Sequence, residues 1–266
     1  MIRCKDVCVE YPSADGKTIF ALKNISLEIN DSEFVCIIGP NGSGKSTLAL
    51  ALTGLRQVSS GTIVIDQKDI NTLLKTREIR DLTGIVFQNP DNQLLTNVLE
   101  HELAFALENR SVDKEEMIKQ VNKTICDFQM QDLKGYSPNQ LSGGQKQKLA
   151  IASVMITMPK YLFLDESTSY LDSEDRKMIT DLLTGGFKNR KKDGFSIVLI
   201  TQFSYEALFC DRLIVLNEGE LILDDSPDKV FTKNQSVLEK IGIEVPLRYQ
   251  LKNAVPSLKI SKGMLN

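Results

Sequence analysis

The sequence predicts an α/β protein in which a mostly parallel sheet is covered by helices on both faces. Short apolar runs that are typical of buried strands recur along the chain, at residues 34–38, 62–65, 84–87, 161–164, 196–200 and 213–216. Segments with helical spacing of their apolar residues separate these runs. Because parallel strands need a crossover connection, usually a helix, this alternation favours a parallel sheet.

Length and composition limit the classes of protein that fit. The 266 residues allow one α/β domain with a sizeable core and an inserted or appended part. The net charge of -3, without a dense Lys/Arg block, argues against a nucleic-acid partner. One histidine and the lack of a CxxC pair argue against a zinc site. We therefore expect buried, reduced thiols at Cys4, Cys8, Cys36, Cys126 and Cys210.

The order of the patterns divides the chain. Residues 1–30 alternate apolar and polar side chains around a turn-rich segment, which predicts an antiparallel hairpin. Residues 89–155 predict a helical insertion, in which residues 113–128 form a helix that Asp113 and Glu116 cap as a pair. We expect a main domain over residues 1–235 and a tail over residues 236–266 that serves packing or dimerisation.

The termini and the hydropathy of the chain bear on its location. The N-terminus lacks the basic-then-apolar pattern of a secretory signal, and no apolar run reaches the roughly 18 residues that a membrane helix needs. We therefore expect a cytosolic protein that reaches a membrane only through a partner.

A phosphate-binding loop follows the first apolar run. The segment GPNGSGKS matches G-x-x-x-x-G-K-[ST] and lies between a predicted strand and a predicted helix, as that motif requires. Its glycines let backbone N–H groups turn toward phosphate, Lys45 can reach the β- and γ-phosphates, and Ser46 can offer its hydroxyl to Mg²⁺. The predicted nucleotide-binding residues are Gly39, Pro40, Asn41, Gly42, Ser43, Gly44, Lys45, Ser46 and Thr47.

Two carboxylates follow the apolar run at residues 161–164. Asp165 and Glu166 end a strand that we expect to be buried, where unpaired carboxylates are costly. Mg²⁺ bound to ATP would compensate the charge of Asp165, and Glu166 could orient or deprotonate the attacking water. We therefore predict Asp165 as a metal ligand and Glu166 as a catalytic residue.

The segment LSGGQKQK at residues 141–148 distinguishes between families of phosphate-loop proteins. Ser142 and Gln145 predict a capping box at a helix start, which leaves the helix N-terminus and the glycines facing an anion. Together with the phosphate loop and the two carboxylates, this segment resembles the signature of ABC ATPases. The resemblance covers about residues 1–230.

The ABC resemblance implies a fold and a mode of assembly. The implied fold is a P-loop NTPase (RecA-like) core with an N-terminal antiparallel β-subdomain and an inserted α-helical subdomain. The implied assembly is a head-to-tail dimer with a second ABC ATPase subunit, in which two ATP molecules lie between the phosphate loop of one subunit and the signature of the other. Its signature residues here are Ser142, Gly143, Gly144 and Gln145.

Further site residues follow from the same resemblance. Tyr11 resembles the aromatic residue that stacks on adenine, although packing explains it equally well. Gln88 resembles the glutamine that senses Mg²⁺ and the attacking water, and so it is predicted as both metal ligand and catalytic residue. Asp172 resembles a residue of the loop that crosses the dimer interface.

One position departs from the ABC pattern. Gln202 stands after the run at residues 196–200, where the family has a histidine that contacts the γ-phosphate. An amide can donate a hydrogen bond but cannot become cationic. If the lost contact is worth about 1 to 3 kcal/mol, turnover at this site falls by roughly ten- to a hundredfold. We expect an asymmetric pair whose partner retains the histidine, and we interpret His101 as a surface residue.

The segments at residues 88–95 and 100–109 are similar to those of energy-coupling factor (ECF) transporter ATPases and their cobalt and nickel relatives. This resemblance implies a peripheral subunit on the cytoplasmic face of the membrane. Its implied partners are a transmembrane T subunit and a substrate-binding S subunit, and the implied cargo is a vitamin or a transition-metal ion. Leu94, Leu95, Val98 and Leu99 could line the groove for the membrane partner, or could simply be core. The alternatives are an ATPase of another ABC transporter class and a soluble ABC ATPase acting on ribosomes or nucleic acid.

Overall fold

The computed structural model describes residues 1–12, 16, 18–169 and 171–254. It divides into two compact units, one formed by Met1–Thr72 with Val198–Asn266 and the other by Leu73–Ile197. Both units mix strands and helices, which confirms the predicted α/β class. Each of the six predicted apolar runs contributes a strand. Four of the predicted turn positions, residues 13–15 and 17, lie outside the described residues.

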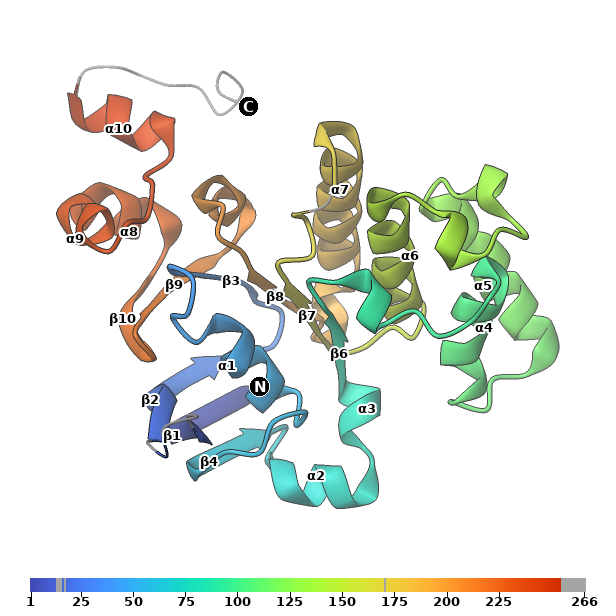
Figure 1. Cartoon of the computed structure of the whole chain (residues 1–266), viewed down its shortest axis with the longest axis horizontal. Coiled ribbons are helices and arrows are strands. Elements are labelled where there is room, and N and C mark those ends of the chain that lie inside the picture. The colour runs from blue at the N-terminus through green and yellow to red at the C-terminus, as the bar shows by residue number, and fades with distance from the viewer. Residues whose placement is uncertain (13–15, 17, 170, 255–266) are drawn as a thin grey trace. The chain divides into compact units, whose positions relative to one another are not determined.

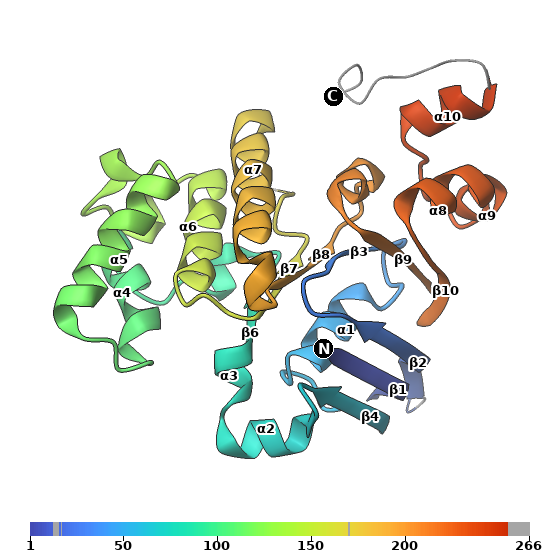
Figure 2. The same ribbon diagram turned by 180° about the vertical axis from the view of Figure 1, so that it is seen from behind.

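An antiparallel sheet opens the first unit. Its strands follow the order β2-β1-β4-β5, with bounds Thr18–Ile29, Ile2–Pro12, Ser60–Ile65 and Lys68–Asp69. The predicted N-terminal hairpin is present, because β1 and β2 pair in antiparallel register from Ile2↔Ile29 to Pro12↔Thr18. Figures 1 and 2 show β1, β2 and β4 side by side. Val7 and Ile25, two apolar residues of the alternation, are fully buried, whereas Ile19 at the start of β2 is 55% exposed.

A second set of strands in this unit carries the predicted phosphate-binding loop. The order is β10-β9-β3-β8, with bounds Glu220–Asp225, Arg212–Asn217, Phe34–Ile38 and Ser196–Ile200, and β8 lies at the division between the units. β3 pairs in parallel with β9, and all five of its residues are buried. Burial on both faces explains its uninterrupted apolar sequence.

The strands β9 and β10 form a hairpin that the sequence analysis missed. Two residues connect them, Glu218 with φ 48° and Gly219 with φ 81°. Positive φ at both central residues is the requirement of a type I′ turn, whose twist matches that of the flanking strands. The Glu-Gly pair was therefore the available signal.

The second unit combines two parallel strands with most of the helices. β6 (Thr83–Val86) pairs with β7 (Tyr161–Asp165). Its helices are α3 (Ile79–Leu82), η1 (Pro90–Asn92), α4 (Leu99–Glu108), α5 (Lys114–Asp127), η2 (Gln131–Leu133), η3 (Pro138–Gln140), α6 (Gly143–Met155), α7 (Ser173–Arg190) and η4 (Lys191–Asp193). Every element between residues 89 and 155 is helical, and α4, α5 and α6 lie together in both views (Figures 1 and 2). The domain limits drawn from the sequence remain predictions.

The helix α5 tests the prediction for residues 113–128. Asp113 is its N-cap and accepts a hydrogen bond from the Glu115 N–H at 3.0 Å. Glu116 does not complete the predicted pair, because its carboxylate accepts from Gln120 one turn later. Val121 and Ile125 are buried as the periodicity predicts, whereas Ile118 is 52% exposed.

Three helices follow β10: α8 (Pro227–Lys233), α9 (Gln235–Lys240) and α10 (Leu247–Ala254). Tyr249 of α10 is almost fully buried, its ring lies 5.2 Å from that of Phe231, and its hydroxyl donates to Asp228 at 2.7 Å. The described part of the predicted tail thus packs on α8. Residues 255–266 lie outside the described residues.

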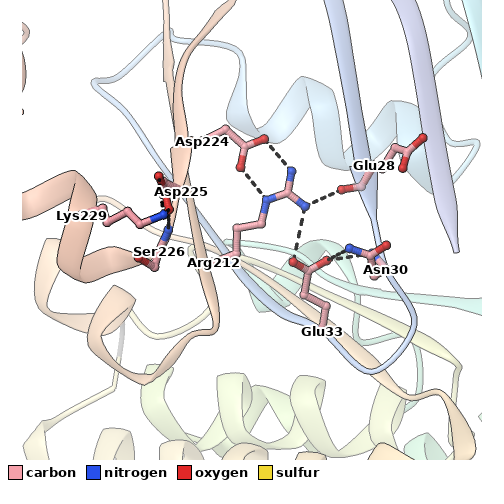
Figure 3. Close-up of polar contacts among 8 residues, drawn as sticks. All are labelled: Glu28, Asn30, Glu33, Arg212, Asp224, Asp225, Ser226 and Lys229. Atoms are coloured by element: carbon pink, nitrogen blue, oxygen red, sulfur yellow. Dashed lines mark hydrogen bonds and ion pairs between the residues drawn. The ribbon is translucent and has the colours of Figure 1, made fainter.

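A cluster of charged residues connects several strands of the first unit (Figure 3). Arg212, at the start of β9, makes two parallel hydrogen bonds to Asp224 of β10. Its guanidinium also donates to the Glu28 carbonyl at 2.8 Å and to Glu33 at 3.4 Å. The hydrogen bonds to Asp224 raise the pKa of Arg212 above its usual range. The cluster therefore stays charged and links β2, β9, β10 and the turn before β3.

Candidate functional site

The phosphate loop connects β3 to α1 (Lys45–Leu52), as its motif predicts. The Lys45 side chain is buried, and its ammonium donates to the carbonyls of Gly39 at 2.8 Å and Pro40 at 3.0 Å. The loop is also held by the β9–β10 turn, because the Gly219 N–H donates to the Ser43 carbonyl at 3.1 Å. A positive charge is thus placed at the start of α1, where the helix dipole is also positive.

Two glycines of the loop allow it to pack closely against neighbouring backbone. A Cβ at Gly39 would lie 2.2 Å from the Leu216 carbonyl oxygen, and one at Gly44 would lie 2.5 Å from that of Ala21. Gly44 also has φ 99°, which a side chain would strain. The buried Ser43 hydroxyl has no hydrogen-bond partner among the described residues. The unsatisfied Ser43 hydroxyl, just before the N-terminus of α1, is a donor that a bound anion could use.

The remaining loop residues lie where a ligand can reach them. Asn41, Gly42 and Ser46 are exposed, and Pro40 and Thr47 are half-buried. Ser46 and Thr47 belong to the first turn of α1. Their assignment to nucleotide and, for Ser46, to Mg²⁺ stays a prediction.

Gln202 lies beside the phosphate loop. It follows β8, which neighbours β3, and the Thr201 N–H donates to the Ile37 carbonyl at 3.1 Å. Ile37 stands two residues before Gly39, so the chain after β8 runs next to the start of the loop. The Gln202 side chain is exposed. Its predicted contact with the γ-phosphate stays a prediction.

Tyr11, at the end of β1, has a half-buried ring. The Arg56 guanidinium lies over this ring at 4.0 Å from its centroid. A cation–π contact of this kind already covers one face. The predicted stacking on adenine would therefore have to use the other face.

In the second unit the structure brings Gln88 and Glu166 together. The Gln88 Nε2 donates to the Glu166 carboxylate at 2.9 Å. Asp165 and Glu166 are both buried at the end of β7, and Glu166 has the left-handed backbone angle φ 48°. Backbone strain of this kind persists where surrounding contacts hold it. The two predicted catalytic residues of this unit thus share one site.

The signature forms the predicted capping box. The Ser142 hydroxyl accepts from the Gln145 N–H at 3.3 Å, and the Gln145 carbonyl oxygen Oε1 accepts from the Ser142 N–H at 2.9 Å. Ser142 and Gly143 are exposed, and a Cβ at Gly143 would meet no atom within 4 Å. The start of α6, with Gly144 following, therefore faces open space with a positive helix end.

Other predicted residues have local roles in the structure. Asp172 is the N-cap of α7 and accepts from Glu174 N–H at 3.0 Å and Asp175 N–H at 2.8 Å. His101 is exposed, as the surface interpretation predicts. Four cysteines are buried, but Cys126 is exposed, so the expectation of buried thiols is wrong at that residue. The periodicity of α5 leaves Cys126 on its outer face.

The predicted Mg²⁺ ligands are divided between the units. Ser46 belongs to the first unit, and Gln88 and Asp165 to the second. No cluster of three or more His, Cys, Asp or Glu residues capable of holding a metal occurs in the described part of the chain. The donor set expected for Mg²⁺ on a nucleotide, a hydroxyl with few carboxylates plus phosphate oxygens, needs no such cluster. The assignment stays a prediction.

The sequence analysis missed two glutamines that hold the backbone beside Gln88. Gln93 and Gln147 bond to the N–H and the carbonyl of Phe87. Nothing local marks either residue, because amide side chains are common on helix surfaces and in loops. The position of Gln147 within a run of otherwise buried helix residues appears only in the folded chain.

A family model described as "ABC transporter" matches residues 22–169, which is more than half of the chain. This chain belongs to the ABC transporter family. Membership places the phosphate loop, the Asp165–Glu166 end of β7 and the α6 capping box in an ATP-binding, ATP-hydrolysing cassette. It also confirms the expected family and the P-loop fold class.

Relatives of this ABC ATPase include energy-coupling factor proteins. It is 41% identical to the energy-coupling factor transporter ATP-binding protein EcfA1 of Ligilactobacillus salivarius over 231 residues, which is 87% of this chain and 80% of that protein. It is 36% identical to EcfA1 of Clostridioides difficile over 264 residues, 99% of this chain and 92% of that protein.

Solved ABC structures share the fold of this ABC ATPase. The ATP-binding cassette MJ0796, a dimer in a post-hydrolysis state with ADP and Pi, has a TM-score of 0.78 and 31% identity, covering 85% of this chain and 99% of that one. The protein cbiO1 from Clostridium perfringens, described as part of the ABC transporter complex cbiONQ, has a TM-score of 0.74 and 34% identity, covering 94% and 97%. In the described residues of this ABC ATPase, no helix has the length and apolar content of a membrane span.

Proposed function

We propose that this chain is the ATP-hydrolysing subunit of an ECF-type importer and works as one half of an asymmetric, head-to-tail ATPase pair. The observation that carries the proposal is the capping box at the start of α6, which presents Ser142 and Gly143 outward. A chain that has its own phosphate loop does not need a second anion site for the same phosphates. The outward face of α6 therefore serves the ATP of a second subunit.

The residues of this chain have distinct tasks in the proposed reaction. Backbone N–H groups of residues 39–46 and the Lys45 ammonium bind the phosphates. Ser46, Gln88 and Asp165 would hold Mg²⁺, which would neutralise phosphate charge when bound. Glu166 orients or deprotonates the attacking water, and Gln88, bonded to Glu166 at 2.9 Å, sets its direction.

The membrane partners follow from the relatives rather than from the ATP site. ECF transporter ATPases and cbiO1 of the cbiONQ complex are similar over nearly the whole chain. We propose a transmembrane T subunit and a substrate-binding S subunit as partners, a position at the cytoplasmic face of the membrane, and a vitamin or transition-metal ion as cargo. Nucleic acid is not a proposed partner, since the net charge is -3.

The substitution at Gln202 provides the test of the asymmetric pair. Gln202 lies beside the phosphate loop but its amide cannot become cationic. We expect Gln202→His to raise the kcat for ATP of the purified full-length chain by roughly ten- to a hundredfold, with a smaller change in ATP affinity. Phosphate release and nucleotide binding measure the two quantities.

A matched control is Gln120→His, which places the same side chain at a half-buried position of α5. It should leave kcat unchanged. Fast hydrolysis by the unmodified chain, with no gain in Gln202→His, would remove the reason for a better partner site. Binding of ATP without any hydrolysis in either variant would contradict the ATPase role itself.

A further inference from the structure

The peptide before Gln88 is held by side chains on both of its polar groups. The Phe87 N–H donates to Gln93 Oε1 at 3.1 Å. The Phe87 carbonyl accepts from Gln147 Nε2 at 3.2 Å. β6 ends at Val86, so these two side chains take over where the strand pairing stops.

Both glutamines attach this peptide to α6. Gln147 is a residue of α6 and is fully buried. Gln93 reaches the same helix, because its Nε2 donates to the Ala150 carbonyl at 3.1 Å. On the far side of Gln88, Lys146 of α6 pairs with Asp91 at 2.7 Å. The segment around Gln88 is therefore tied to α6 before and after the glutamine.

The helix α6 begins at the signature. The hydrogen bonds of Gln93 and Gln147 therefore connect the signature to the segment that carries Gln88. One end is the Ser142–Gln145 capping box. The other is the Gln88 amide, which donates to Glu166 at 2.9 Å. An α-helix moves nearly as a rigid rod, and a side-chain hydrogen bond at each tie transmits its displacement.

The unfavourable burial of the Gln147 amide supports a specific role for this side chain. Its Oε1 is buried without a hydrogen-bond partner among the described residues, which is unfavourable because the oxygen has lost its water. A methionine would fill similar space without that cost. What methionine cannot supply is the hydrogen bond from Nε2 to the Phe87 carbonyl.

We propose that Gln93 and Gln147 are positioning residues that tie the Phe87 peptide to α6, so that a displacement of the signature helix displaces Gln88 relative to Glu166. The proposal rests on the proposed ATPase function and adds a path by which a partner at the signature affects the hydrolytic site of this chain. Neither glutamine touches the reacting atoms.

The first test removes each tie in the full-length chain. Gln93→Met and Gln147→Met should lower kcat by about three- to tenfold, the loss of one net hydrogen bond, while KM for ATP stays within about twofold. Hydrogen exchange of the Phe87 amide should accelerate in Gln93→Met, which removes its acceptor. Gln120→Met, which changes a half-buried glutamine of α5 that bonds to Glu116, is the matched control and should change none of these. Gln93 is half-exposed, so its variant stays informative if Gln147→Met folds poorly.

A second test separates hydrogen bonding from shape. Gln147→Glu has nearly the same shape but, when ionised, no donor for the Phe87 carbonyl. Burial raises the pKa of such a carboxyl, so lowering the pH restores an O–H donor. The ratio of its kcat to that of the unmodified chain at the same pH should therefore rise as the pH falls. Protonation also removes the cost of a buried charge, so the recovery supports the tie only if the midpoint of thermal unfolding of Gln147→Glu stays constant over the same pH range.

The outcomes separate this proposal from the proposed function. Unchanged exchange at Phe87 in Gln93→Met overturns the tie whatever the hydrolysis rate. Rates equal to the control in both methionine variants, or a KM that rises while kcat holds, also overturn it. If the unmodified chain hydrolyses no ATP, the proposed function fails, and the exchange at Phe87 still decides whether the tie exists.

Discussion

Glu166 and the glycines of the phosphate loop show how single residues set the site. Glu166 has φ 48° although it is not glycine, a conformation that costs about 1 to 3 kcal/mol where it is sustained. Burial and the hydrogen bond from Gln88 hold it. Gly39 has no such strain, but a neighbouring carbonyl oxygen excludes any Cβ. Backbone strain therefore marks Glu166, and close approach of a neighbouring backbone marks Gly39.

The cysteines differ in reactivity for the same kind of local reason. Burial raises the pKa of Cys4 to about 12, and it also raises that of Cys210. Near neutral pH these thiols stay protonated and inaccessible, whereas Cys126 is exposed. We expect a maleimide to label the native chain rapidly at one thiol, and Cys126→Ser to abolish that rapid phase. Mass spectrometry of the labelled chain checks this, and rapid labelling of the serine variant would contradict it.

At the scale of elements, local signals predicted most of the structure. The capping box of α6 and the buried strand β3 follow from spacing alone. The β9–β10 hairpin was missed because its two-residue turn contains Glu218 in place of the usual asparagine or aspartate. The prediction for the N-terminus of α5 was correct for Asp113 but wrong for Glu116, because the Glu116 carboxylate accepts a hydrogen bond from Gln120 instead.

The Arg212 cluster is expected to stabilise the pairing of β9 with β10. Arg212 and Asp224 are each less than a quarter exposed and form a two-pronged pair that links β9 to β10 (Figure 3). We expect Arg212→Met to lower the free energy of unfolding by about 1 to 2 kcal/mol, measured by urea denaturation. Arg3→Met, which breaks the half-exposed pair with Glu28, should cost under about 1 kcal/mol. Equal losses in the two variants would contradict a special role for the cluster.

At the scale of the whole molecule, the predicted site is shared between two units. The phosphate loop and Gln202 belong to one unit, and Gln88, Glu166 and the signature to the other. The residues that could line the groove for a membrane partner differ in how far they are buried. Leu99 is fully buried and is core, whereas Leu95 is 71% exposed. Of these two, Leu95 is therefore the side chain that a partner can reach.

We expect Leu95→Asp to weaken attachment to the membrane partners by about tenfold, because it replaces apolar contact area with a charge. ATP binding by the purified chain should not change. Co-purification from solubilised membranes measures the attachment. Ile19→Asp, at an equally apolar and 55% exposed position of β2, is the control. An equal loss in both variants, or none in Leu95→Asp, would exclude Leu95 from the docking surface.

The sequence by itself determined the features that depend on residues close together in the chain. The phosphate loop, the α6 capping box, the N-terminal hairpin and the buried strands all follow from spacing within a few residues. The departure at Gln202 was also visible in the sequence, but only through the resemblance to ABC ATPases, which have a histidine there. Steric limits and hydrogen bonds between near neighbours fix such features.

Only the tertiary structure decided which distant side chains meet. Gln88 and Glu166 are 78 residues apart, Phe87 and Gln147 are 60 apart, and Glu33 and Arg212 are 179 apart. Their partners are polar side chains with no periodic signal, and each contact depends on strands and helices that first have to pack. Long-range packing therefore selected the glutamines that hold the Phe87 peptide, and no local pattern could have distinguished them from surface amides.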